Sequence, residues 1–348
     1  MKRTVKICAV VAAAVLVFAS AAFAVMDKKD IKPAPQSTGP IKLSAEMVKF
    51  EPSLFVDGAF GMPGMVYMGG KLYTERKDGT MEGWTLSGTA LKADKTAFGG
   101  KPLNADGDNL VLAGGKLYTD PFFGPVVIDA KKGLVYDGKG NPDRLSAKKL
   151  AVDPTGKWGL GSWMNNDVVK IDMAKFAANQ ACSAVWPPLA NLKDDAKRKC
   201  PLKDISTIFI GKNRVYVGGS IAKNKLKPEN ATRSMVGVVV YDYSGKQLMF
   251  YSSEGKQLGA GGAMGWAHGF IETKDGGFAV LDGNLRTLFF FDKSLKYVGA
   301  IDLMKLTGLT YPWPSSIQRL DADTCLLMTT QEFAASKYEA IVWKIKGM

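Results

Sequence analysis

The sequence predicts an all-β fold made of repeated four-stranded antiparallel units, and three observations support this prediction. Apolar or alternating runs of about four to eight residues are separated by turn residues, and little of the chain has a helical period. The second glycine of a tight turn, or its equivalent, recurs at positions 70, 115, 156, near 212, 277 and near 323. Spacings of about 41 to 65 residues with four strands in each unit are typical of β-propeller blades.

The clearest unit spans residues 268–292. Its turn at residues 274–277 (Lys-Asp-Gly-Gly) supplies the positive φ that a two-residue hairpin needs. Residues 278–281 form a short apolar strand, which the bend Asp282-Gly283-Asn284 ends. Residues 285–291 form the next strand, and residues 297–301 form the fourth.

The other units are looser copies of this one. Their predicted strands include residues 65–68, 71–74 and 81–86; 110–113, 116–119, 125–129 and 133–136; 149–152, 157–162 and 168–172; 207–210, 214–217, 237–241 and 247–251; and 316–320, 325–329 and 340–345. The sixth unit ends after three strands, whereas residues 47–56 form one unpaired strand at the other end. Pairing the two would complete the last of six blades and remove both exposed sheet edges. A seven-bladed ring and a two-sheet sandwich are the alternatives.

The first 24 residues have the pattern of a cleaved export signal. Basic residues at positions 2, 3 and 6 precede an apolar run at 7–18, and Ala22-Phe23-Ala24 is a small-x-small cleavage site. A membrane anchor is the alternative, but the apolar run is short. No later run reaches the roughly 18 apolar residues that span a bilayer, so we expect a soluble periplasmic or secreted protein.

Polar, Pro-rich residues 25–46 are predicted to be a disordered leader, and residues 47–348 a single domain. The whole chain carries a net charge of +13, which falls to +10 when the three basic residues of the signal are removed. A basic exported protein favours anionic partners, such as acidic glycans, phospholipid headgroups or acidic proteins, and nucleic acid is a poor candidate. The alternative is a basic soluble protein whose charge has no partner.

Three of the four cysteines follow the signal. Cys182 and Cys200 lie in one polar loop and are predicted to form a disulfide in an oxidising compartment. Cys325 lies inside an apolar strand and is predicted to be a buried thiol. A single histidine in the chain argues against a zinc site.

The fifth unit resembles the NHL-type repeat of six-bladed, TolB-like propellers. The matching positions are Gly269-Phe270, Asp275-Gly276, residues 278–281, Asp282, Asn284, Arg286, Leu288, Phe290 and Asp292. The third unit matches in part, through Asp153, Gly156, Asn165-Asn166 and residues 169–172, with a valine where Arg286 stands. The remaining units match in period only. The resemblance implies a closed ring in which the bend aspartate usually ties its own turn together.

Two sets of polar and aromatic residues are expected to share one face of the ring. Glu75, Asp120 and Asp282 follow second strands at equivalent positions, and the loops that lead into first strands supply the others. The predicted ligand-binding residues at this channel mouth are Glu75, Asp120, Trp163, Trp266, His268, Asp282, Asn284 and Trp313. Carboxylates with amide oxygens such as those of Asn165 or Asn284 could hold Ca²⁺, or bind a cationic ligand beside an aromatic wall. The alternative is that the bend carboxylates accept backbone N–H bonds.

His268 invites a catalytic interpretation, but a general base needs a substrate and an orienting group within reach. No nucleophile elbow, pair of metal-binding histidines or phosphate-binding loop accompanies it. Lactonases of the gluconolactonase–regucalcin type share six-bladed architecture, but their first-strand glutamate has no counterpart near residues 62–64. No catalytic residue is therefore assigned, and a hydrogen-bonded structural histidine is the alternative.

Two insertions, residues 173–203 and 220–234, interrupt the repeat. The first carries Trp186 and a basic cluster, Lys197, Arg198 and Lys199; the second carries Lys223, Lys225, Lys227 and Arg233. Long loops on a rigid framework usually carry binding, so these residues are predicted to contact a protein or an anionic polymer. The sequence thus favours a monomeric exported binding scaffold, with a metal-dependent hydrolase or lactonase at the channel mouth as the alternative.

Overall fold

The computed structural model describes residues 41–348, except residues 60, 63, 102, 105–109, 120–125, 137–142, 144–148, 163–166, 231–234, 257 and 259–260. The predicted export signal and residues 25–40 of the predicted leader lie outside the described residues. Residues 33–348 belong to one compact unit, and its first described strand, β1 (Ser44–Glu51), begins before the predicted domain boundary. No helix in the described part is long and apolar enough to cross a membrane.

Four of the five hydrogen-bonded sheets in the described residues contain four strands each, with the orders β8 to β11, β12 to β15, β16 to β19 and β20 to β23. The first of these comprises β8 (Leu110–Ala113), β9 (Lys116–Thr119), β10 (Val126–Asp129) and β11 (Gly133–Tyr136). The second comprises β12 (Ala151–Val152), β13 (Trp158–Ser162), β14 (Val168–Asp172) and β15 (Ser183–Val185). The third comprises β16 (Leu202–Ile210), β17 (Arg214–Ile221), β18 (Val236–Asp242) and β19 (Gln247–Ser252). The fourth comprises β20 (Ala267–Glu272), β21 (Phe278–Asp282), β22 (Thr287–Phe291) and β23 (Tyr297–Asp302).

The remaining sheet has ten strands and joins the two ends of the domain. Its path is β24-β25-β26-β1-β6-β5-β4-β3, with β2 paired to β26 and β7 paired to β5. These strands are β2 (Phe55–Asp57), β3 (Gly64–Met68), β4 (Lys71–Glu75), β5 (Thr80–Ser87), β6 (Ala90–Ala93), β7 (Leu103–Asn104), β24 (Trp313–Arg319), β25 (Thr324–Ala334) and β26 (Lys337–Lys346).

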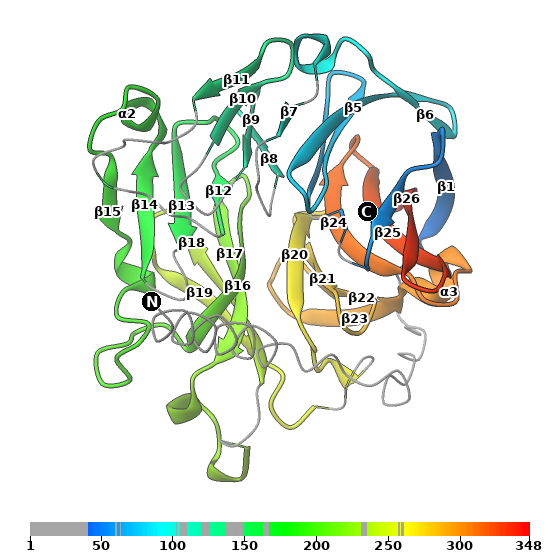
Figure 1. Cartoon of the computed structure of the whole chain (residues 1–348). Coiled ribbons are helices and arrows are strands. Elements are labelled where there is room, and N and C mark those ends of the chain that lie inside the picture. The colour runs from blue at the N-terminus through cyan, green and yellow to red at the C-terminus, as the bar shows by residue number, and fades with distance from the viewer. Residues whose placement is uncertain are drawn as a thin grey trace, which may run out of the picture. The chain divides into compact units, whose positions relative to one another are not determined.

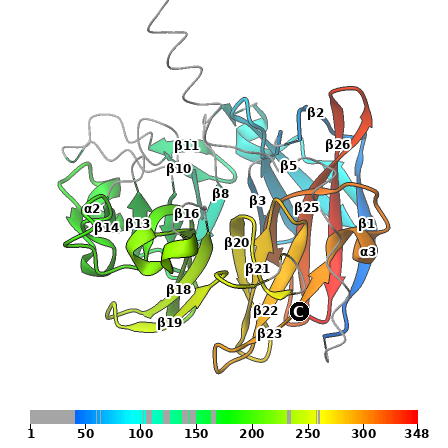
Figure 2. The same ribbon diagram turned by 90° about the horizontal axis from the view of Figure 1, so that it is seen from below.

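Strand β1 closes this arrangement from the N-terminal side. It pairs antiparallel with β26, from Ser44 opposite Lys346 to Lys49 opposite Ile341, and Figure 2 shows the two strands side by side. The predicted pairing of the N-terminal strand with the last unit is therefore confirmed. β1 also pairs in parallel with β6, which the sequence analysis did not anticipate and which merges two groups of strands into one sheet.

The first strands of the repeated units contact one another in a closed cycle. β3 contacts β8, and the cycle continues through β12, β16, β20 and β24 back to β3 (Figure 1). Sheets that follow one another around a central ring of inner strands define a β-propeller, and the predicted propeller fold is confirmed. The two-sheet sandwich is excluded by this cycle.

Apolar clusters between neighbouring sheets form the core. The fourth sheet and β24–β26 share one such cluster, which includes Leu281, Leu288, Ile317 and Leu327. Within the fourth sheet, Phe278 and Phe291 stack with ring centroids 4.6 Å apart and an interplanar angle of 4°. Burial on both faces explains why these strands read as continuous apolar runs.

Short helices lie in the connections. Asp172 caps α2 (Met173–Ala177) by accepting hydrogen bonds from the backbone of Ala174 and Lys175, and Asp302 caps α3 (Leu303–Thr307). The 3₁₀ helices are η2 (Ala97–Gly100), η3 (Pro187–Leu189), η4 (Lys223–Lys225) and η5 (Pro228–Asn230).

The predicted disulfide is wrong in this structure, because no disulfide joins the described cysteines. Cys182 packs with Val152 and Ile171, whereas Cys200 packs in a different apolar cluster with Trp186. The two cysteines therefore belong to separate parts of the core, and the backbone N–H of Leu202 donates to Cys200 Sγ at 3.4 Å. Cys325 is buried in β25 as predicted, and burial raises its pKa to about 12.

Candidate functional site

A cavity of about 1280 Å³ lies among the inner strands. Its walls come from β3, β8, β12, β16, β20 and β24. One end is lined by His268 and Ser315, near the starts of β20 and β24, and the other by the hairpin turns at residues 211–214 and 273–276. The cavity thus runs along the inner strands towards the turn between the first and second strand of each unit.

Of the predicted ligand-binding residues that the structure describes, His268 alone lines this wall. Its Nε2 lies 2.9 Å from the carbonyl oxygen of Ser315, and because a carbonyl can only accept, Nε2 carries the proton. Burial lowers the pKa of His268 to about 4, with a further contribution from the nearby Lys149 ammonium, while the Ser315 bond opposes the shift. The imidazole is therefore neutral near pH 7 and links β20 to β24.

We expect His268→Gln to reduce the acid sensitivity of the fold, since glutamine keeps a donor near the position of Nε2. The pKa of 6.5 in an unfolded chain falls to about 4 in the folded protein, so stabilisation by the neutral ring is complete above 6.5 and is lost as the pH falls towards 4. Urea unfolding at several pH values measures this. Between about pH 7 and about pH 4, the free energy of unfolding should fall by up to about 3 kcal/mol more in the wild type than in the variant. Parallel stability curves for the two proteins would contradict this.

Asp282 is fully buried and holds two loops together. Oδ2 accepts from the backbone N–H groups of Gly265 at 2.6 Å and Trp266 at 3.1 Å, and Oδ1 accepts from Leu285 at 2.8 Å. Burial raises the pKa of Asp282 to about 6, although these backbone bonds oppose the shift. The geometry matches the structural alternative, in which a bend carboxylate ties the backbone of its own unit.

Arg286 occupies the aromatic site that the sequence analysis reserved for a cationic ligand. The guanidinium carbon lies 3.4 Å from the ring centroid of Tyr311 and 4.0 Å from that of Trp313, and Nη1 donates to the carbonyl oxygen of Asn284 at 3.0 Å. Arg286 is completely buried, and its φ of 53° is in the left-handed region. From the sequence, Arg286 could be assigned only as a position of the repeat. The Tyr-Pro-Trp stretch that leads into β24 was the sequence feature from which the aromatic partners of Arg286 could have been predicted.

The other predicted site residues lie apart from the cavity wall or outside the description. Glu75 is fully buried, and Thr119 Oγ1 lies 3.0 Å from its Oε1 and 2.9 Å from its Oε2. The cavity wall does not include five of the predicted residues, namely Glu75, Trp266, Asp282, Asn284 and Trp313. Asp120 and Trp163 lie outside the described residues. Among the residues that the structure describes, no group of three His, Cys, Asp or Glu side chains is close enough to hold a metal ion.

The hairpin-turn end of the cavity has a charged rim that the sequence analysis missed. Glu272 accepts from the backbone N–H of Lys212 at 3.2 Å and from the hydroxyl of Tyr216 at 3.0 Å. Arg214 donates to the carbonyl oxygens of Gly276 at 3.4 Å and Lys293 at 3.2 Å. These contacts fix the turns of the third and fourth sheets to each other. The lysines at the tips of these turns were the sequence feature from which a charged rim could have been predicted.

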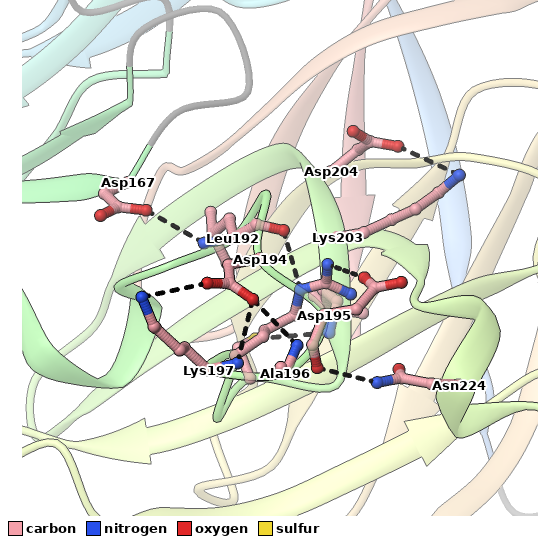
Figure 3. Close-up of polar contacts among 12 residues, drawn as sticks. Asp167, Leu192, Asp194, Asp195, Ala196, Lys197, Lys203, Asp204 and Asn224 are labelled. Carbon is pink, nitrogen blue, oxygen red and sulfur yellow. Dashed lines mark hydrogen bonds and ion pairs between the residues drawn. The ribbon is translucent and has the colours of Figure 1, made fainter.

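The two insertions pack on one another beside the third sheet. Asn224 Nδ2 donates to the carbonyl oxygen of Asp195 at 3.1 Å (Figure 3). The backbone N–H of Ala222 donates to the carbonyl oxygen of Pro201 at 2.8 Å. The exposed lysines between residues 191 and 227 are Lys193, Lys197, Lys199, Lys223, Lys225 and Lys227, which we call the insertion surface. Arg233 lies outside the described residues.

Two residues of the first insertion belong to its interior. Arg198 is 7% exposed; its Nε donates to the carbonyl oxygen of Leu192 at 2.8 Å, and it forms an ion pair with Asp195. Trp186 is 4% exposed and meets Tyr241 edge to face at 5.3 Å. Both support the loop from inside and are not available to a partner.

No protein-family model and no curated protein matches the sequence. The fold is similar to a solved protein of unknown function from Bacteroides thetaiotaomicron, with 10% identity, a TM-score of 0.55, and coverage of 90% of this chain and 84% of that one. It is also similar to the WD40 repeats of RRP9, with 10% identity, a TM-score of 0.50, and coverage of 90% and 99%. At this level of identity the likeness supports the propeller fold alone.

Proposed function

We propose that this chain is an exported interaction scaffold that binds a partner rich in acidic groups through the insertion surface. Its framework is a six-bladed propeller, in which β24–β26 with β1 form one blade and β3–β6 form another. The cycle of inner strands supports this blade count, because the parallel pairing of β1 with β6 then joins two blades edge to edge.

The observation that carries the proposal is that exposed lysines stand on segments held in place by several buried or bridging contacts. Glu254 Oε1 accepts from the backbone N–H of Lys227 at 2.6 Å and from Asn230 Nδ2 at 3.1 Å, which ties the second insertion to the end of β19. The Asn224–Asp195 bond then joins it to the first insertion. A basic surface on pre-ordered loops loses little conformational entropy when it binds, and it attracts acidic partners over several ångströms.

The lysines keep their charge available to a partner. Lys197 forms an ion pair of 3.5 Å with Asp194, but its side chain is 73% exposed, so the pair is weak in water. Lys223, Lys225 and Lys227 make no ion pair with any described residue. Ammonium groups arranged in this way favour several separated carboxylates, as on an acidic protein segment.

Reversing three charges of the insertion surface should weaken binding to an acidic polymer. We expect Lys223→Glu/Lys225→Glu/Lys227→Glu to raise the Kd for poly-glutamate about tenfold or more at low salt, with a smaller difference in high salt. Fluorescence anisotropy with labelled poly-glutamate measures both effects.

The matched control reverses three exposed lysines on the second-unit turns, Lys116→Glu/Lys131→Glu/Lys132→Glu, which changes the net charge equally. At about 0.1 M salt this control should leave the Kd within about threefold, since surface charges more than about 10 Å from the binding site are then largely screened. Equal losses of affinity in both triple variants would show that net charge alone drives binding. Unchanged affinity in Lys223→Glu/Lys225→Glu/Lys227→Glu would contradict the proposal.

A further inference from the structure

We propose that the central cavity binds an amphipathic organic anion, with its apolar body between the inner strands and its anionic group at the hairpin-turn rim near Lys212 and Lys293. This site is independent of the insertion surface. Three features of the wall support it: an apolar middle, a polar inner end and a basic rim.

The middle of the cavity offers partly exposed apolar side chains. Met68 from β3, Leu112 from β8 and Phe209 from β16 all line the cavity and are only half-buried, unlike the core residues beside them. Sites for drug-sized ligands usually have volumes of about 300 to 1,000 Å³. The cavity, at about 1280 Å³, is large enough for a ligand of this kind. An apolar molecule here would cover surface that the fold leaves open to water.

The inner end of the cavity has hydrogen-bonding capacity to spare. Ser315 is 6% exposed, and its hydroxyl has no hydrogen-bond partner within the described protein, although the residue lines the cavity. His268 uses Nε2 on the Ser315 carbonyl, so the other ring nitrogen, Nδ1, is an acceptor. A buried hydroxyl without a partner is uncommon. The Ser315 hydroxyl oxygen is enclosed by protein, so a polar ligand group satisfies it only after a local shift at this end of the cavity.

The rim favours an anion, because its carboxylates are already used within the protein. Glu272 accepts from Lys212 and Tyr216, and Asp321 accepts from the backbone of Asp323 at 2.9 Å and Thr324 at 2.8 Å. The basic groups that line the same end are Lys212, Arg214, Lys274, Lys293 and Arg319, against the acidic Glu272, Asp275 and Asp321.

The ammonium groups of Lys212 and Lys293 are the available ones at this end. Both residues are exposed, and neither forms an ion pair with a described residue, whereas Lys274 pairs with Asp323. Anionic groups are therefore attracted to the mouth, while a cationic ligand would meet a surplus of like charge.

Two fluorescent probes that differ in one charged group can test the site in the full chain. Anilinonaphthalene sulfonate is an amphipathic anion, and N-phenylnaphthylamine has the same ring system without the sulfonate. We expect Lys212→Gln/Lys293→Gln to weaken binding of the sulfonate about fivefold or more and to leave the neutral probe within about twofold. Leu112→Trp, which narrows the apolar middle, should weaken both probes about tenfold.

Two further measurements make the result decisive. The Lys223→Glu/Lys225→Glu/Lys227→Glu variant should bind both probes like the wild type, which separates this site from the insertion surface. Thermal unfolding of each variant checks that the fold is retained. Leu112→Phe, a smaller enlargement of the same side chain, replaces Leu112→Trp if the latter unfolds, and it should also weaken binding of both probes. Equal effects of the lysine changes on both probes, or no effect of any cavity variant in folded protein, would overturn the proposal.

Discussion

Replacing Asp282 by alanine should lower the free energy of unfolding by about 3 to 5 kcal/mol, because three backbone donors lose their acceptor inside the protein. The donors belong to Gly265, Trp266 and Leu285, and Asp282 itself has no exposed surface. Water cannot replace the carboxylate without opening the bend and the loop before β20. Chemical denaturation of the wild type and the variant at about pH 7 measures the difference.

Asp282→Asn separates the role of the acceptor from that of the charge. Asparagine keeps one carbonyl oxygen, so it should restore part of the stability lost in the alanine variant. The folded pKa of about 6 exceeds the usual aspartate pKa of 3.8, so the stability contributed by the protonated carboxyl is present below 3.8 and is lost as the pH rises through about 6.

The free-energy difference between wild type and Asp282→Asn should therefore shift by about 3 kcal/mol in favour of the wild type as the pH falls from about 7 to about 4. The opposite contribution of His268 is common to both proteins and cancels in this difference. A difference that does not vary with pH would mean that Asp282 titrates normally despite its burial.

Much of the fold was predictable because local patterns determine it. Glycines in the hairpin turns have positive φ, as at Gly70 and Gly115, so tight turns could be placed from the sequence. The unpaired strand near the N-terminus and the missing strand of the last unit led to the pairing of β1 with β26. The parallel pairing of β1 with β6 was not predictable, since it depends on how two neighbouring edges meet in space.

The site was predicted less well, because residue type does not show which way a side chain faces. Glu75 and Asp282 were correctly placed at bends, yet their carboxylates bind protein donors in the interior. The rim around Glu272 depends on contacts between neighbouring units, such as Tyr216 with Glu272, which are 56 residues apart in the chain. The prediction of a Cys182–Cys200 disulfide was wrong for a similar reason. Both cysteines lie in one loop, but their side chains pack in different apolar clusters.

Arg286→Ala should destabilise the fold by about 3 to 5 kcal/mol, because removing one member of a buried charged cluster leaves the others without compensation. The guanidinium stacks on Tyr311 and Trp313, and it favours the ionised forms of the buried Asp282 and Asp302. Its Nε and Nη2 have no hydrogen-bond partner in the described protein, so stacking and charge, more than hydrogen bonding, must hold it in place.

Arg286→Lys tests which of these two contributions dominates. Lysine keeps the positive charge but loses the planar group that lies against both rings. If charge dominates, Arg286→Lys should retain most of the stability. If stacking dominates, it should lose nearly as much as alanine.

The Arg286→Ala/Asp302→Asn double variant then measures the coupling between the two charges. Asp302 is 1% exposed, and burial raises its pKa while the Arg286 charge lowers it. Without Arg286, the buried Asp302 carboxyl therefore loses one of the charges that favour its ionised form. Asp302→Asn should therefore lower the free energy of unfolding less in the Arg286→Ala background than in the wild type, and the difference should be about 1 kcal/mol or more. Strictly additive losses would mean that the Arg286 charge is not coupled to Asp302, and that its contacts with Tyr311, Trp313 and the Asn284 carbonyl account for its contribution.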